Sequence, residues 1–134
     1  MSAEETYVPG VVWWLIVATV VGLVLVAAFW RPEAAVTRPD PFGLDERTWV
    51  EGVAYGVLTL SLLYALAPTA EPAGISPLAV SVFVIVLAAL VETGQALSGV
   101  ATFQVIDLTA AIACSVGVAL VWDAGRRALR MPPA

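Results

Sequence analysis

The stretch Val91-Glu-Thr-Gly-Gln-Ala-Leu-Ser-Gly-Val-Ala-Thr-Phe-Gln-Val-Ile-Asp107 separates two long apolar segments. It is short enough to be the turn of a hairpin between two membrane helices. Glu92 lies near the end of the first segment, and Asp107 lies just inside the second. Such a turn places both carboxylates near one membrane surface. Because a charge within lipid is costly, acidic residues at these positions indicate a functional site.

The composition of the 134 residues is that of a membrane protein. Hydrophobic residues make up 60% of the chain and charged residues 13%, and the mean hydropathy is +0.93. Four apolar segments, at about 8–30, 49–66, 77–97 and 103–122, approach or exceed the roughly 20 residues that cross a bilayer. Helices are expected, because a single strand leaves its backbone groups unsatisfied in lipid. We therefore predict an all-α fold, a single four-helix transmembrane bundle of two helical hairpins with short loops.

The ends of the predicted spans carry recognisable signals. Ser76 is a plausible N-cap, and Pro77 suits the first turn that follows it. The five tryptophans fall near span ends, as an aromatic belt at the membrane surfaces places them: Trp13, Trp14, Trp30, Trp49 and Trp122.

The charge of the chain excludes some partners. The net charge is −5 and lysine is absent, which is typical of a halophile but also fits a GC-rich genome. This balance argues against a nucleic-acid surface, which needs basic contacts to phosphate. It also argues against a basic patch for anionic lipid. We expect membrane lipid as a partner, while a homo-oligomer or another membrane protein remains open.

Orientation in the cell membrane rests on the arginines. Each face receives three of them, Arg126, Arg127 and Arg130 on one side and Arg31, Arg38 and Arg47 on the other. The C-terminal cluster is tighter, so the positive-inside tendency favours a cytoplasmic C-terminus.

Threading through the membrane gathers the acidic residues. The first and third loops lie on the same face of any four-span arrangement. Glu51 near the start of the second span, Glu92 near the end of the third and Asp107 near the start of the fourth therefore share one face. Residues three or four positions away share a helix side with each acid. The predicted ligand-binding pocket consists of Glu51, Tyr55, Glu92, Gln95, Gln104 and Asp107, with Arg47 as the nearest cation.

Each acid also has a structural interpretation. Thr48 and Glu51 have the spacing of a capping box, with Thr48 as N-cap. Asp107 lies in a first helical turn, where the helix dipole favours negative charge. Glu92 lies towards a helix C-terminus, where the dipole opposes it, although a hydrogen bond to a neighbouring helix would satisfy it. Function is the favoured interpretation for Glu92.

Small residues predict a close helix contact near the acids. Gly52 and Gly56 form a small-xxx-small pair, which favours packing against a neighbouring helix and, less strongly, a dimer contact. Cys114 is the single cysteine, so we interpret it as a small hydrophobic residue in a helix interface.

Familiar catalytic groups are missing from the sequence. The chain has no histidine, so neither a Ser-His or Cys-His pair nor a His-ligated zinc site can form. We expect no cofactor and lean against an enzyme, and the sequence names neither a catalytic residue nor a metal. Three hypotheses remain: a site for a cation or a lipid or cell-envelope headgroup, a proton or cation pathway, and a structural subunit of a membrane assembly.

The pattern around the acids resembles the VanZ-like family of small integral membrane proteins. The family's Glu-x-x-Gln motif and following Asp are matched by Glu92-Thr-Gly-Gln95 and Asp107. The Ala-Tyr-x-Val-Leu end of its second-span pattern is matched by Ala54-Tyr55-Gly-Val57-Leu58. The resemblance covers roughly 47–121, and it implies an acidic site on the extracytoplasmic side in the cell envelope.

The chain departs from this family at several positions. Glu51 stands where the family often has His, Ala101 about where the turn has an Arg, and Ala111 where an Asn is typical. The resemblance therefore implies a divergent member of the family with an altered site. Arg47 is a candidate for the missing cation.

Overall fold

The computed structural model describes residues 10–30, 43–67 and 75–130. Within these ranges the chain forms four helices and no strand: α1 (Gly10–Phe29), α2 (Glu46–Leu66), α3 (Pro77–Leu97) and α4 (Val105–Arg130). All four are long and apolar enough to cross a membrane. The prediction of an all-α, four-helix multi-pass membrane protein is confirmed.

Four helix boundaries differ from the predicted spans. Helix α1 ends at Phe29, one residue earlier than expected. Helix α2 begins three residues earlier than expected, because Asp45 in extended conformation is its N-cap. The capping-box interpretation of Thr48 is therefore wrong. Helix α4 begins two residues later than expected and continues eight residues past Trp122, since no proline lies between Trp122 and Pro132. Residues 8 and 9 of the first predicted span lie outside the described residues.

Helix α3 begins as its sequence predicts. Ser76 is the N-cap, and its hydroxyl oxygen accepts a hydrogen bond from the backbone N–H of Ala79 at 3.1 Å. Pro77 occupies the first turn, where its missing N–H leaves no bond unmade.

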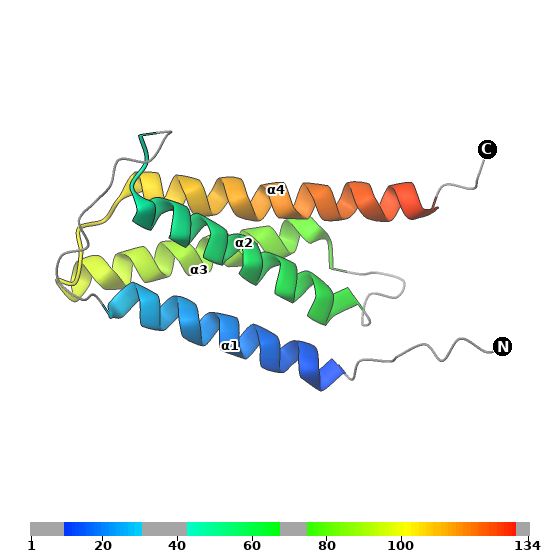
Figure 1. Ribbon diagram of the computed structural model, residues 1–134, viewed down its shortest axis with the longest axis horizontal. Coiled ribbons are helices and arrows are strands. Elements are labelled where there is room, and N and C mark those ends of the chain that lie inside the picture. Colours follow the sequence, from blue (N-terminus) through cyan, green and yellow to red (C-terminus); the bar gives the residue numbers. More distant parts are fainter. Residues whose placement is uncertain (1–9, 31–42, 68–74, 131–134) are drawn as a thin grey trace.

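The helices run alternately up and down, so α1 begins and α4 ends at the same end of the bundle (Figure 1). The opposite end, where α1 and α3 end and α2 and α4 begin, is called the turn end (Figure 1). Helix α2 packs against α4 and α1, and α3 packs mainly against α4. Helix α1 is the least buried, with only Val17, Val24 and Ala28 buried, so most of its surface faces lipid.

Aromatic residues lie towards the end of the bundle where α1 begins and α4 ends. The rings of Trp13 and Tyr64 stack with their centroids 4.9 Å apart, and Trp122 meets Tyr64 edge-on at 4.7 Å. Trp30 follows α1 and Trp49 lies in the first turn of α2, so both lie at the turn end. This distribution fits the predicted aromatic belts.

Candidate functional site

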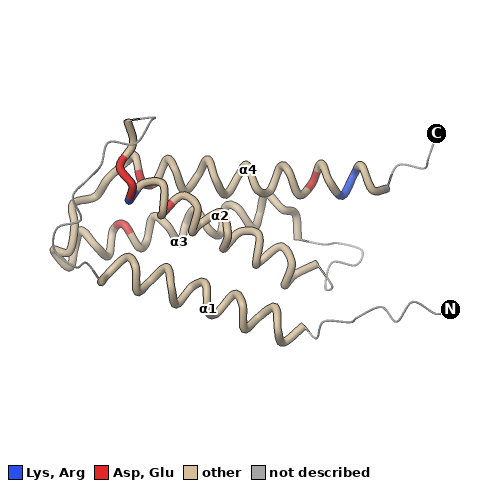
Figure 2. The backbone as a smooth tube through the Cα atoms, in the orientation of Figure 1, with Lys and Arg blue, Asp and Glu red and all other residues tan. Residues whose placement is uncertain are grey.

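Three carboxylates from three helices converge at the turn end of the bundle. Figure 2 shows acidic positions of α2, α3 and α4 gathered there. One carboxylate oxygen from each of Glu51, Glu92 and Asp107 lies within 4.8 Å of the others. Glu92 and Asp107 are only 3% and 1% exposed, and Glu51 is partly buried. The acids therefore lie at the end that the threading of the chain predicts, and the helix faces bring them together.

Arg47 supplies the positive charge of the cluster. Its Nε donates a 2.8 Å hydrogen bond to Oε1 of Glu51, one turn further along α2. Its Nη2 lies 3.3 Å from Oδ2 of Asp107 and 3.6 Å from Oε1 of Glu92. A single guanidinium thus contacts all three acids. When every group is ionised, two negative charges remain in excess.

Thr48 ties α2 directly to α4. Its hydroxyl donates a hydrogen bond of 2.5 Å to Oδ1 of Asp107, and both side chains are buried. Asp107 lies in the first turn of α4, where the helix dipole also favours its charge. The structural interpretation of Asp107 therefore holds alongside any binding role.

Oδ2 of Asp107 is in a different position from Oδ1. It is fully buried and accepts no hydrogen bond from the described residues, although Nη2 of Arg47 is close enough for an ion pair. A buried charged oxygen without a hydrogen bond is costly. This oxygen therefore has hydrogen-bonding capacity that the described residues leave unused.

The turn after α3 carries the chain back to Glu92. Gly99 adopts a left-handed conformation with φ +71°, and the N–H groups of Gly99 and Val100 donate to the carbonyls of Ala96 and Gln95. This is the Schellman arrangement that ends many helices, and it favours glycine at the left-handed position. The returning chain then donates the backbone N–H of Gln104 to Oε2 of Glu92 at 3.2 Å.

Gln95 links the cluster to α1. Its Nε2 donates a 2.8 Å hydrogen bond to the carbonyl of Ala28, one of the last carbonyls of α1 that have no partner within the helix. Its Oε1 accepts from Nη2 of Arg47 at 3.4 Å. Gln95 thereby orients the guanidinium and fixes the end of α1 against the site.

The remaining predicted residues lie beside the carboxylates in different ways. Tyr55 is buried one turn from Glu51, within range of the charges of all three acids. Gln104 contacts the site through its backbone N–H, whereas the helical spacing predicted a contact by its side chain. The side chain of Gln104 is partly exposed.

Two glycines let α2 approach α4 closely enough to form the site. A Cβ atom on Gly52 would lie 3.2 Å from Sγ of Cys114 and 3.3 Å from Cβ of Ala110. A Cβ atom on Gly56 would lie 3.5 Å from Cβ of Cys114. Both contacts are with α4, one and two turns below Thr48. The small-residue pair therefore serves packing within the chain, and Cys114 lies in that helix interface.

Sequence reasoning gave Thr48 the wrong role and did not include the Ala28 carbonyl. A signal for Thr48 was present. It lies four residues before Gly52 and eight before Gly56, on the same side of α2. The side that packs on α4 therefore extends to Thr48 and carries its hydroxyl to Asp107. Nothing in the local sequence marks Ala28, because its contribution is a backbone carbonyl.

Comparison of the chain with protein-family models, curated proteins and solved structures finds no match in any of the three.

Proposed function

We propose that this multi-pass membrane protein is of VanZ-like type and binds a small cation between Glu51, Glu92 and Asp107. The observation that carries the proposal is Oδ2 of Asp107, which is buried and accepts no hydrogen bond from the described residues. One carboxylate oxygen of Asp107 lies within 4.8 Å of an oxygen from each of the other two acids. Carboxylate oxygens are the ligands that hard divalent cations prefer.

The spacing of the oxygens favours a cation of the size of Ca²⁺. Ca²⁺ takes oxygen ligands at roughly 2.3–2.6 Å, so oxygens on opposite sides of it stand about 5 Å apart. Mg²⁺ holds its ligands at about 2.0–2.1 Å and requires nearly ideal octahedral geometry. Three oxygens that all lie within 4.8 Å of one another can reach one Ca²⁺, whose coordination geometry is flexible. A lipid or cell-envelope headgroup is bulkier, and the burial of Glu92 and Asp107 disfavours it.

Arg47 acts in this proposal as the counter-charge that the ion replaces in part. Its 2.8 Å hydrogen bond to Glu51 is short, while its contacts with Asp107 and Glu92 are 3.3 and 3.6 Å long. An entering cation takes over the two longer contacts and leaves the first. Arg47 also supplies the positive charge that the VanZ-like pattern has near the position of Ala101, which supports the family proposal.

A proton or cation pathway across the membrane ranks second. The hydroxyls of Thr59, Ser61 and Thr109 each donate to a backbone carbonyl of their own helix, and Ser81 donates to the carbonyl of Ser115. These groups are engaged in helix structure and do not extend the acidic cluster through the bilayer. A purely structural role would leave the cluster without cation affinity, so a calcium titration separates it from binding.

The proposal includes the orientation of the protein in the cell membrane. The arginine cluster after Trp122 favours a cytoplasmic C-terminus, which assigns the turn end and its acids to the extracytoplasmic side. Cation binding needs no catalytic step, so we assign no reaction.

Calcium is expected to stabilise the purified full-length protein in lipid nanodiscs. At a hundred times its Kd, a ligand that binds only the folded state adds about 2.7 kcal/mol to the free energy of unfolding. Glu92→Gln is expected to weaken calcium binding about tenfold or more, since a bond to a charged group contributes about 1.5–3 kcal/mol. Isothermal titration calorimetry and thermal unfolding with calcium measure both effects.

Asp123→Asn is the matched control. Asp123 pairs with Arg127 near the other end of α4, so the substitution removes one acid without touching the cluster, and calcium affinity should be retained. Equal loss of calcium affinity in Glu92→Gln and Asp123→Asn would show that the affinity depends only on the net charge of the protein. Absence of any heat or stabilisation with calcium would refute the proposed function.

A further inference from the structure

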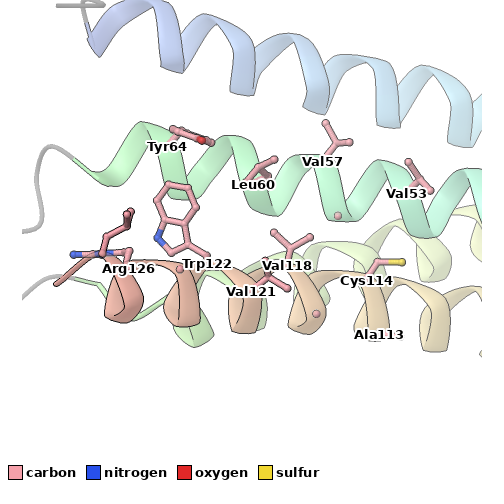
Figure 3. A pocket seen from close by; sticks show the side chains of 14 residues that line it. Val53, Val57, Leu60, Tyr64, Ala113, Cys114, Val118, Val121, Trp122 and Arg126 are labelled. Atoms are coloured by element: carbon pink, nitrogen blue, oxygen red, sulfur yellow. The ribbon is translucent and has the colours of Figure 1, made fainter. Parts of the chain in front are cut away.

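A long apolar groove runs along the outside of the bundle between α2 and α4 (Figure 3). Its volume is about 790 Å³. Gly56, Gly117 and Gly125 are among its lining residues, and a Cβ atom on Gly117 or Gly125 would meet no other atom within 4 Å. Because these glycines have no side chains, the space between the helices stays open on a surface that faces lipid.

Arg126 lies near one end of the groove, beside Trp122 and Tyr64 (Figure 3). It follows Asp107 by 19 positions on α4, a rise of about 28 Å, which nearly equals the roughly 30 Å of the bilayer core. Arg126 therefore lies at the membrane surface opposite the acidic cluster. The neighbouring Arg127 pairs with Asp123 at 2.5 Å, whereas Arg126 makes no ion pair with any described side chain.

We infer that the groove binds one acyl chain of an anionic phospholipid whose phosphate is held by Arg126. Between Ala113 and Arg126 the groove follows α4 for about 20 Å, longer than the roughly 15 Å of one leaflet. An acyl chain entering from the leaflet next to Arg126 can therefore lie in the groove along its whole depth. Trp122 and Tyr64 suit the headgroup level. Among the described residues that line the groove, Arg126 is the only basic one, so selectivity for an anionic headgroup rests on its guanidinium.

A second copy of the chain fits the groove less well. A two-fold axis along the membrane normal would bring the two Arg126 side chains to the same level. No acidic residue lines the groove to compensate them. Like charges opposed at an interface cost several kcal/mol. A phospholipid fits better. Its phosphate matches the charge of Arg126 at the end of the groove, and its acyl chain matches the apolar lining along the length of the groove.

Native mass spectrometry of the full-length protein with added lipid tests the inference. The probes are phosphatidylglycerol and phosphatidylcholine with identical acyl chains. The wild type is expected to retain one phosphatidylglycerol, bound about fivefold more tightly than phosphatidylcholine, the scale for one arginine beside an anionic lipid. Arg126→Gln should abolish this preference, while Arg127→Gln, which removes the same charge, should keep it. Gly117→Leu should weaken the binding of both lipids, because the leucine side chain fills the groove.

Gly22→Leu is the control for Gly117→Leu. A Cβ atom on Gly22 would also meet no other atom within 4 Å, but this glycine lies on α1 away from the groove, so lipid retention should be unchanged. Equal losses in the two arginine variants, or in the two leucine variants, would overturn the inference. A dimer that Gly117→Leu dissociates would identify a second copy as the occupant and overturn it as well.

Discussion

Arg47→Met is expected to lower the free energy of unfolding by about 3 kcal/mol. Removing one partner of a buried ion pair typically costs about 3–5 kcal/mol, because it leaves an uncompensated buried charge. Here Glu92 and Asp107 are almost completely buried, while the Arg47 side chain is 25% exposed, so the lower end of the range applies. Reversible unfolding in mixed micelles, followed by the loss of helical circular dichroism, measures the difference.

Arg127→Met is the control for Arg47→Met. Arg127 forms an i,i+4 ion pair with Asp123, but its side chain is 76% exposed, and exposed pairs contribute only about 0–1 kcal/mol. Calcium should restore much of the stability lost in Arg47→Met, because the ion supplies the missing positive charge. Equal stability of the two variants would show that Arg47 does not balance the acids.

Gly52→Leu is expected to separate α2 from α4 and to destabilise the fold by about 1–3 kcal/mol. Even a Cβ atom at this position lies 3.2 Å from Sγ of Cys114, and the remaining three carbons of leucine have no space beyond it. Because Thr48 and Asp107 meet one turn away across the same helix pair, calcium binding should weaken with the packing. Thermal unfolding and calcium titration of one preparation measure both effects.

Two further variants isolate the contact made by Gly52. Gly22→Leu makes the same change on the lipid-facing surface of α1, where a Cβ atom meets nothing within 4 Å, so stability should not fall. Adding Cys114→Ala to Gly52→Leu removes the nearest contact and should recover part of the loss. Wild-type stability of Gly52→Leu would mean that α2 and α4 are not in close contact at this level.

The common level of the acids followed from sequence because it depends only on the number of spans. Four apolar segments place Glu51, Glu92 and Asp107 near one surface however the helices pack. The positions of Gly52 and Gly56 similarly indicated which side of α2 approaches a neighbour, since only glycine permits such a short separation.

The exact partners did not follow from sequence, because they depend on helix rotation and on backbone groups. The sequence predicts Thr48 as an N-cap, yet α2 begins at Glu46. The hydroxyl of Thr48 is therefore not needed as a cap and bonds to Asp107 of α4 instead. Gln104 contributes its N–H and Ala28 its carbonyl, and nearly every residue type carries these groups. A side-chain pattern therefore cannot mark them, whereas the tertiary arrangement specifies them.

The most direct measurement is a crystal structure of the protein grown in lipid with Sr²⁺, a Ca²⁺ substitute that anomalous diffraction identifies. The account predicts one Sr²⁺ site coordinated by carboxylate oxygens of Glu92 and Asp107, with Oδ2 of Asp107 among the ligands. It also predicts that the guanidinium of Arg47 withdraws from Asp107 and keeps its bond to Glu51. A structure at saturating Sr²⁺ with no anomalous peak between these carboxylates, and with Arg47 still against all three, would contradict it.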